Sequence, residues 1–153
     1  MVDETFWAWF AGFIDGDGHL TLAKHKNKRY HLGYQWVPKL YITNIDSHVM
    51  EIISLNIGIG HIAFLGKNNE YRQYRLESKQ VRDILPKIIP YLKIKKQEAI
   101  ILLQATNIIN DTPYKGCRIS QEKDTKLREI SEAMLEIRLN RKQKGGLRNN
   151  DRI

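Results

Sequence analysis

The chain has 153 residues and is 42% hydrophobic, which is enough for one domain with a continuous core. Its 25 Lys and Arg residues against 17 Asp and Glu give a net charge of +8. This favours a polyanionic partner such as nucleic acid, with a merely basic soluble protein as the alternative. No apolar run approaches the ~18 residues of a membrane helix, and the N-terminus lacks a basic signal-peptide start, so we expect an intracellular protein without a targeting signal. The single cysteine, Cys117, excludes an internal disulfide and a multi-cysteine zinc site.

The first predicted element is a helix over residues 5–17. Its apolar residues recur at the spacing of an amphipathic helix, at Phe6, Phe10, Phe13 and Ile14. Its second face has almost no side chain and would let another backbone come close, at Ala8, Ala11 and Gly12. Asp15 and Asp17 alternate with glycines at its C-terminus, where the helix dipole already places negative charge. Because acidic residues cost stability at that end, we expect it to recruit a cation.

Alternating polar and apolar residues predict strands at 19–26, 33–43, 61–65 and 70–77. Apolar periodicity predicts further helices at 47–57, 79–89, 99–109 and 121–140, with the last two lying in the C-terminal region 95–140. Asp46 and Ser47 would cap the first of these helices, Gly58 would end it, and Ser78 would cap the second. We expect Pro86 to kink its helix or begin a new turn. The order predicts one mixed α/β (α+β) domain over 1–140, with an antiparallel sheet backed by helices on one face, and a mobile basic tail over 141–153.

The other face of this sheet presents polar and aromatic side chains, at Thr21, His25, Gln35, Lys39, Tyr41, Tyr71, Gln73 and Arg75. Arg, Lys and Gln match the donors and acceptors of base edges in the major groove of DNA. Basic residues in the turns and the tail are suited to phosphates, at Lys28, Arg29, Lys67, Arg141 and Lys142. The pattern predicts a DNA-binding face, with an ordinary solvated sheet face as the alternative.

Residues 10–18, Phe-Ala-Gly-Phe-Ile-Asp-Gly-Asp-Gly, resemble the LAGLIDADG motif of homing endonucleases. The predicted order αββαββα is that family's arrangement, and residues 90–97, Pro-Tyr-Leu-Lys-Ile-Lys-Lys-Gln, resemble its basic segment. The resemblance implies a saddle-shaped antiparallel sheet. One motif copy implies a homodimer, in which the helices at 5–17 pack across a two-fold axis through Ala8, Ala11, Gly12 and Asp15, and Asp15 would mainly support the structure of the helix end. The alternative is that the small residues meet another helix of the same chain. A two-fold axis implies a long, nearly palindromic DNA target.

The same resemblance implies the roles of the site residues. Asp17 would be the metal ligand, with the carbonyl of Gly16, for Mg²⁺ or another divalent cation such as Mn²⁺. Lys95 would be the active-site lysine, which can stabilise the transition-state phosphate or hold the attacking water, with Lys93 and Lys96 as neighbouring candidates. Asn44 occupies the place of a glutamine that orients water. His48 lies near a position where relatives use arginine; an exposed helix residue is the alternative, because a neutral histidine lacks the fixed charge.

The implied function is a site-specific DNA endonuclease that makes a double-strand break by Mg²⁺-dependent hydrolysis, leaves short 3′ overhangs and promotes intron mobility. One alternative is an RNA maturase that assists splicing of its host intron, with intron RNA as the partner. Another is a DNA-binding relative that does not cleave. The presence of Asp17 favours cleavage, because a pure binding protein has no need of this carboxylate.

Overall fold

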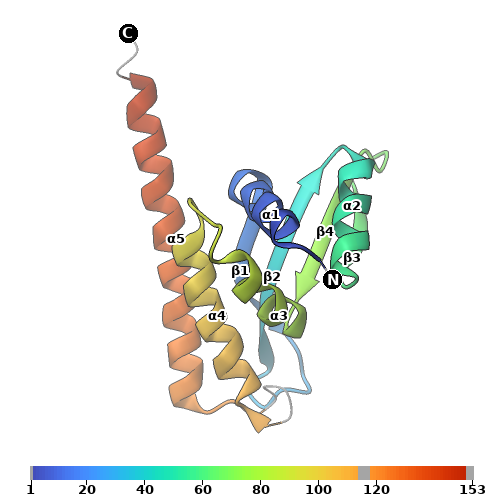
Figure 1. Ribbon diagram of the computed structural model, residues 1–153. Coiled ribbons are helices and arrows are strands. Elements are labelled where there is room, and N and C mark those ends of the chain that lie inside the picture. Colours follow the sequence, from blue (N-terminus) through green and yellow to red (C-terminus); the bar gives the residue numbers. More distant parts are fainter. Residues whose placement is uncertain (1, 114–117, 151–153) are drawn as a thin grey trace.

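A computed structural model describes residues 2–113 and 118–150, the last six as backbone only (Figure 1). The helices are α1 (Glu4–Asp17), α2 (Ser47–Ile57), α3 (Lys79–Ile88), α4 (Lys96–Asn110) and α5 (Gln121–Asn150). The strands are β1 (Gly18–Lys26), β2 (Tyr34–Asn44), β3 (His61–Leu65) and β4 (Tyr71–Glu77). The order begins αββαββα and ends with two further helices, which confirms the predicted mixed α+β class.

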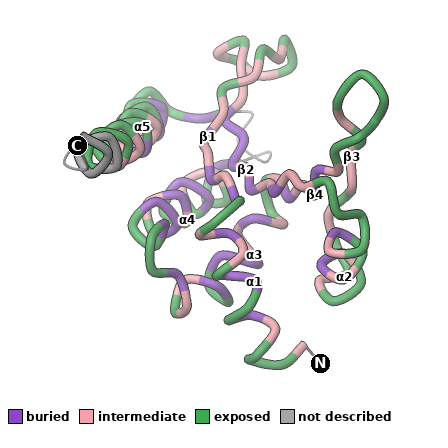
Figure 2. Tube along the Cα trace, turned by 90° about the horizontal axis from the view of Figure 1, so that it is seen from above, coloured by how far each residue is buried: buried purple, intermediate pink, exposed green. Residues whose placement is uncertain are grey.

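The four strands form one antiparallel sheet in the order β1-β2-β4-β3. Strand β2 pairs with β1 over almost its whole length, but with β4 only from Lys39 to Asn44. Seen from above, α1, α2, α3 and α4 lie on one side of the sheet, and the β1–β2 and β3–β4 connections curve away from them (Figure 2). The arrangement leaves the second face of the sheet without a helix over it.

The core lies between the sheet and these helices. Alternate residues of the strands are buried on the helical side, including Leu20, Leu22, Leu40, Ile42, Tyr74 and Leu76. Residues of all five helices meet them or extend the same cluster, including Phe10, Ile14, Met50, Ile84, Leu102 and Leu127. The strands thus bury every second residue and the helices bury residues at helical spacing, as the sequence predicts.

The buried face of α1 differs by one position from the expected one. Trp7, Phe10, Ala11 and Ile14 are buried, at the 3-4-3 spacing of one helix face. Phe6 and Phe13 are only partly buried. Ala8 and Gly12 are exposed as expected, but Ala11 is 0% exposed and packs inside its own chain. The assignment of Ala11 to a dimer surface is therefore wrong.

The ends of α2 and α3 test the predicted caps. Asp46 accepts the N–H groups of His48 and Val49, and Gly58 ends α2 in the left-handed region at φ 72°, both as predicted. Ser78 precedes α3 at φ 53° but makes no side-chain capping bond. Pro86 lies inside α3 near its end and starts no new helix.

Helix α5 is longer than predicted, because it continues from the expected end near residue 140 to Asn150 (Figure 1). At its start, the buried carboxylate of Asp124 accepts hydrogen bonds from Tyr34 Oη at 2.9 Å and Trp36 Nε1 at 2.8 Å. Farther along, Arg138 and Arg141 form ion pairs with the buried Glu98 of α4. The expected mobile tail is thus helical to residue 150; residues 151–153 and Cys117 lie outside the described residues.

In the described part of the chain, no helix combines the length and apolar character needed to cross a bilayer.

Candidate active site and nucleic-acid interface

Asp17 is the last residue of α1 and its side chain is exposed. Asn44, at the end of β2, donates from Nδ2 to Asp17 Oδ2 at 3.4 Å, the long end of the hydrogen-bond range. The Asn44 Oδ1 accepts the backbone N–H of Asp46 at 2.9 Å. Asp46 in turn caps α2 at His48. The sequence-predicted residues Asp17, Asn44 and His48 are thus linked through one chain of contacts.

Asp15, two residues earlier, points back into its own chain. Its carboxylate accepts the backbone N–H groups of Lys93 at 2.7 Å, Ile94 at 3.2 Å and Lys95 at 2.9 Å. The side chain therefore joins the end of α1 to the turn before α4, and these bonds account for it without the expected dimer contact. Of the two motif carboxylates, Asp17 is thus exposed and Asp15 is half-buried and hydrogen-bonded within the chain.

Lys95 is held by the same junction. Its Nζ donates to the carbonyl oxygens of Ile14 at 2.7 Å, Asp15 at 3.0 Å and Gly18 at 2.7 Å, and the residue is 9% exposed. Burial and then the nearby Arg141 lower the pKa of this ammonium, against the opposing effect of Glu98, Asp15 and Asp17. The expected direct approach of Lys95 to a phosphate is not what its contacts favour.

The end of α1 fits a hard divalent cation. The Asp17 carboxylate is exposed, and a methyl group built on the exposed Gly16 would meet no atom within 4 Å, so the backbone there is accessible. A carboxylate and a carbonyl are oxygen ligands of the kind that Mg²⁺ takes, usually with several waters or substrate phosphates. Within residues 2–113 and 118–150, no three His, Cys, Asp or Glu side chains gather into a cluster able to hold a metal.

The predicted DNA-reading residues lie together on the open face of the sheet. The strand register places Thr21 opposite Lys39, His25 opposite Gln35 and Tyr41 opposite Arg75. Gln73 and Tyr71 continue the same face of β4. The basic residues Lys28, Arg29 and Lys67 of the two hairpin turns are exposed. A hollow of about 270 Å³ lies on this face, lined by Lys39, Tyr41, Leu65, Gln73, Arg75, Leu76 and Glu77.

Some of these side chains are bound within the sheet. Lys39 forms an ion pair with Glu77 at 3.3 Å. Gln73 is 9% exposed, donates to Thr43 Oγ1 at 2.8 Å and accepts from Arg75 Nε. Gln73 thus orients the Arg75 side chain. Because Gln73 is itself buried, it is better placed to orient Arg75 than to meet a base.

His19 was missed by sequence reasoning although it shares this face. It lies opposite Tyr41, with ring centroids 4.9 Å apart, and burial followed by Arg138 lowers its pKa. Exposed His61 lies opposite Arg75. Both residues follow the same alternation as Thr21 and Arg75, so extending that pattern to the strand ends would have found them.

The basic end of α5 is divided between internal and exposed charges. Arg141 donates to the Glu98 carboxylate, which is only 2% exposed, so this guanidinium has a partner inside the chain. Lys142 is exposed. Of the two tail residues predicted to bind DNA, only Lys142 keeps a side chain free of a described ion pair.

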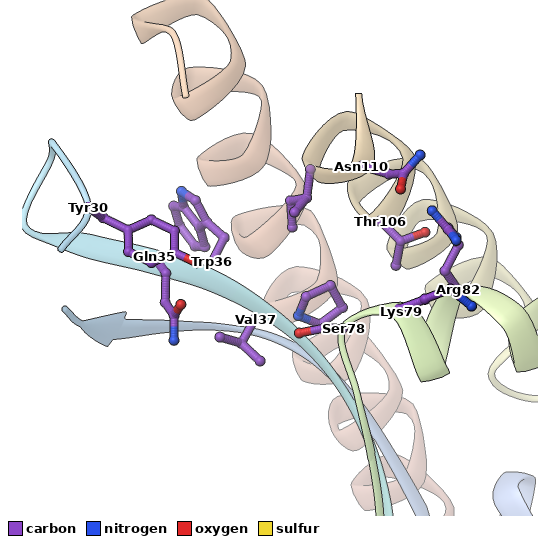
Figure 3. A pocket seen from close by; sticks show the side chains of 11 residues that line it. Tyr30, Gln35, Trp36, Val37, Ser78, Lys79, Arg82, Thr106 and Asn110 are labelled. Atoms are coloured by element: carbon purple, nitrogen blue, oxygen red, sulfur yellow. The ribbon is translucent and has the colours of Figure 1, made fainter. Parts of the chain in front are cut away.

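A cavity of about 420 Å³ lies elsewhere, beside the part of β2 that β4 does not pair (Figure 3). In the close-up, Trp36 and Tyr30 lie on one side of it, with Thr106, Asn110 and Arg82 on the other. Gln35 is the only predicted site residue in its described lining. The cavity is therefore separate from the end of α1, which contributes none of these residues.

The fold and the site define a member of a nuclease family. The family model for LAGLIDADG endonuclease matches residues 10–106, from the α1 motif to the middle of α4. The match covers more than half of the chain, and the chain therefore belongs to the LAGLIDADG endonuclease family.

Individual relatives agree with this assignment. The chain is 26% identical over 104 residues to DNA endonuclease I-CreI of Chlamydomonas reinhardtii, covering 67% of this chain and 63% of that protein. It is 30% identical over 133 residues to a probable intron-encoded endonuclease, Cox1-I1b, of Schizosaccharomyces pombe, covering 82% of this chain but 32% of that protein. The structure of homing endonuclease I-CvuI, crystallised with the I-CreI target, matches with a TM-score of 0.76 at 20% identity, over 88% of this chain and 82% of that one.

Proposed function

We propose that this protein is a homodimeric, site-specific DNA endonuclease that makes a double-strand break in a long, nearly palindromic target by divalent-metal-dependent hydrolysis. The observation that carries the proposal is the exposed Asp17 carboxylate, which lies next to Asn44 at the end of β2. The sheet to which β2 belongs has an open face that is polar and basic. Family membership and the printed names of the relatives support it. The likeness to a probable intron-encoded endonuclease supports a role in intron mobility inside the cell.

The chain's own residues have separate tasks in this reaction. Asp17 and the Gly16 carbonyl would hold the cation, which supplies an activated water and neutralises charge on the leaving oxygen. Asn44, already within 3.4 Å of Asp17, would orient a water at that carboxylate. His48, whose backbone N–H is capped by Asp46, would approach the same site from the start of α2 as a hydrogen-bonding group.

A second copy of the chain would complete the site. Ala8 and Gly12 form an exposed, nearly bare stripe on α1, and Trp9 beside them is 41% exposed. Packing two such stripes across a two-fold axis would bring the α1 ends, and with them both Asp17 residues, toward the centre. With +8 on each chain, twice +8 gives +16 for the dimer, which favours DNA binding that weakens steeply with salt.

The open sheet face would read the target. Arg75 matches the two acceptors of guanine, and Gln35 matches the donor and acceptor of adenine. Thr21, His25, Tyr41 and Tyr71 add contacts along the same face, while Lys28, Arg29, Lys67 and Lys142 would meet phosphates. The chain would then separate base reading on the sheet from phosphate chemistry at the end of α1.

The test compares the wild-type protein with Asp17→Asn on DNA made of the joined exons of its host gene. Wild type should cut both strands when Mg²⁺ is added. Asp17→Asn should bind the same DNA in Ca²⁺ with similar affinity and leave it intact, because the substitution keeps the size of the side chain and removes the negative charge of the metal-binding carboxylate. Cleavage that persists in Asp17→Asn would remove the proposed mechanism. No cut by wild type, together with faster splicing of the precursor RNA, would favour the maturase; specific binding with neither activity would favour the non-cleaving relative.

A further inference from the structure

The end of α1 and the turn before α4 are tied by a reciprocal pair of charged side chains. The Asp15 carboxylate of α1 accepts hydrogen bonds from the backbone N–H groups of residues 93–95. The Lys95 ammonium donates hydrogen bonds to backbone carbonyl groups at the end of α1. Each helix end leaves such backbone groups without partners inside its own helix. The two side chains therefore satisfy each other's helix end, at the point where α1 presents Asp17.

The hydrogen bonds of Lys95 use its whole donor capacity. An ammonium group carries three N–H donors, and three carbonyl oxygens lie 2.7, 3.0 and 2.7 Å from Nζ. The residue is also 9% exposed. A phosphate oxygen would have to displace one of these carbonyls and enter a nearly closed space, so direct contact between Lys95 and DNA is disfavoured.

The three acceptors bracket the proposed metal ligands in the chain. Ile14 and Asp15 come directly before Gly16 and Asp17, and Gly18 comes directly after them. Because the peptide groups on both sides are held by these hydrogen bonds, the backbone of Gly16 and Asp17 between them has less freedom to rotate. The positive charge of Lys95 also lies at the negative end of the α1 dipole, where it offsets the carboxylates of Asp15 and Asp17.

The position of Lys95 is itself supported from α5. Glu98 lies three residues later, in the first turn of α4, and is 2% exposed. Its carboxylate pairs with Arg138 at 3.5 Å and also with Arg141. These ion pairs fix the start of α4 against α5. Lys95, which directly precedes α4, is therefore positioned by the contact with α5 as well as by Asp15.

We propose that Lys95 is a positioning residue that holds the Gly16 carbonyl and the Asp17 carboxylate in place for the cation and does not touch the scissile phosphate. This inference rests on the proposed function of the Asp17 site. Groups that orient metal ligands without touching the metal typically change metal affinity by about 10- to 100-fold when removed. Loss of Lys95 should therefore appear first in cation affinity.

The experiment uses Lys95→Met, which keeps the length of the side chain and removes the ammonium. Its control is Lys126→Met, at an exposed lysine of α5 that pairs only with Glu122 in the described contacts. Mn²⁺ binding to the protein–DNA complex is measured by electron paramagnetic resonance, and single-turnover cleavage is measured across a series of Mg²⁺ concentrations. Lys95→Met should weaken Mn²⁺ binding by about 10- to 100-fold and recover its cleavage rate at saturating Mg²⁺. Lys126→Met should match wild type in both.

Unchanged Mn²⁺ affinity with a saturated rate lowered by about 10²- to 10³-fold would overturn the proposal, because it would assign Lys95 to the transition state. If Lys95→Met does not fold, Asp15→Asn decides: it should weaken Mn²⁺ binding in the same direction, and wild-type affinity there would equally overturn it. Wild type that binds Mn²⁺ on DNA but does not cut would remove the proposed function alone. Wild type that binds no Mn²⁺ would remove both.

Discussion

The junction of α1 with α4 and the open face of the sheet treat polar groups in opposite ways. At the junction, Asp15 and Lys95 make all their described hydrogen bonds to backbone groups of the same chain. On the open face, the side chains of Tyr71 and His61 are exposed and make no hydrogen bond within the described part of the chain. Substitutions at the junction should therefore change stability and geometry, whereas substitutions on the face should change recognition and leave the fold intact.

The largest effect should come from the glycine that closes the junction. Gly18→Ala would place a methyl group 2.7 Å from the Cα and carbonyl oxygen of Ile14, and this backbone cannot move without disturbing the acceptors of Lys95. The free energy of unfolding should fall by about 3 kcal/mol, toward the upper range for overpacked cores. Urea denaturation followed by circular dichroism measures it. Gly16→Ala is the control for stability, because its methyl group meets nothing within 4 Å; equal losses in the two variants would refute the packing argument.

The exposed stripe of Ala8 and Gly12 allows the same comparison, between packing inside the chain and contact with a partner, to be made on α1. Gly12→Ala meets no atom of its own chain within 4 Å, so the chain alone should gain up to about 1 kcal/mol from better helix propensity. A second helix packed against Gly12 would meet the added methyl group and the dimer should weaken, so that on dilution it should dissociate already at a higher protein concentration than wild type. Analytical ultracentrifugation across a concentration series measures this. An unchanged dimer in Gly12→Ala would place the interface elsewhere.

On the open face, Arg75→Ala should weaken binding to the preferred target by about 1–3 kcal/mol and relax the choice of one base pair. Its melting temperature should stay near that of wild type, because Arg75 is only half-buried on a face without a helix above it. Binding to a library with each base pair varied measures the effect. A uniform loss across all sequences would mean that Arg75 meets a phosphate.

The smallest effect is expected in the hairpin turn. Lys28→Ala should weaken binding about equally on all DNA sequences and lower the salt dependence by about one phosphate contact. Fluorescence anisotropy at several KCl concentrations measures the slope. A loss confined to one sequence would move Lys28 from phosphate contact to base reading.

The sheet could be predicted because its physics is local. Alternation along four strands separates buried Leu20, Leu40 and Leu76 from the polar face, and the register within each of the two hairpins then follows from its turn. The buried face of α1 was misassigned because aromatic residues occupy both possible phases, at Phe6 and at Trp7. Only packing against the sheet selects Trp7 with Ala11.

The junction could not be predicted from local patterns. The bonds between Asp15 and residues 93–95 join positions about 80 apart, and no periodicity connects them. Lys95 was found through family resemblance, which supplies a position but not the direction of its ammonium. The length of α5 was missed for a similar reason, because the partner that holds Arg141 is Glu98 on another helix.

The unequal pairing of β2 has a mechanical consequence. From Tyr34 to Pro38 the strand has only β1 beside it, so the end of this hairpin is a two-stranded ribbon, and such ribbons twist more than wider sheets. Asp124 fastens that ribbon to the first turn of α5 through Tyr34 and Trp36. In the proposed complex, a carboxylate about ninety residues further along the chain would thus set the twist of the ribbon, and with it how deeply Lys28 and Arg29 at its tip reach into the DNA groove.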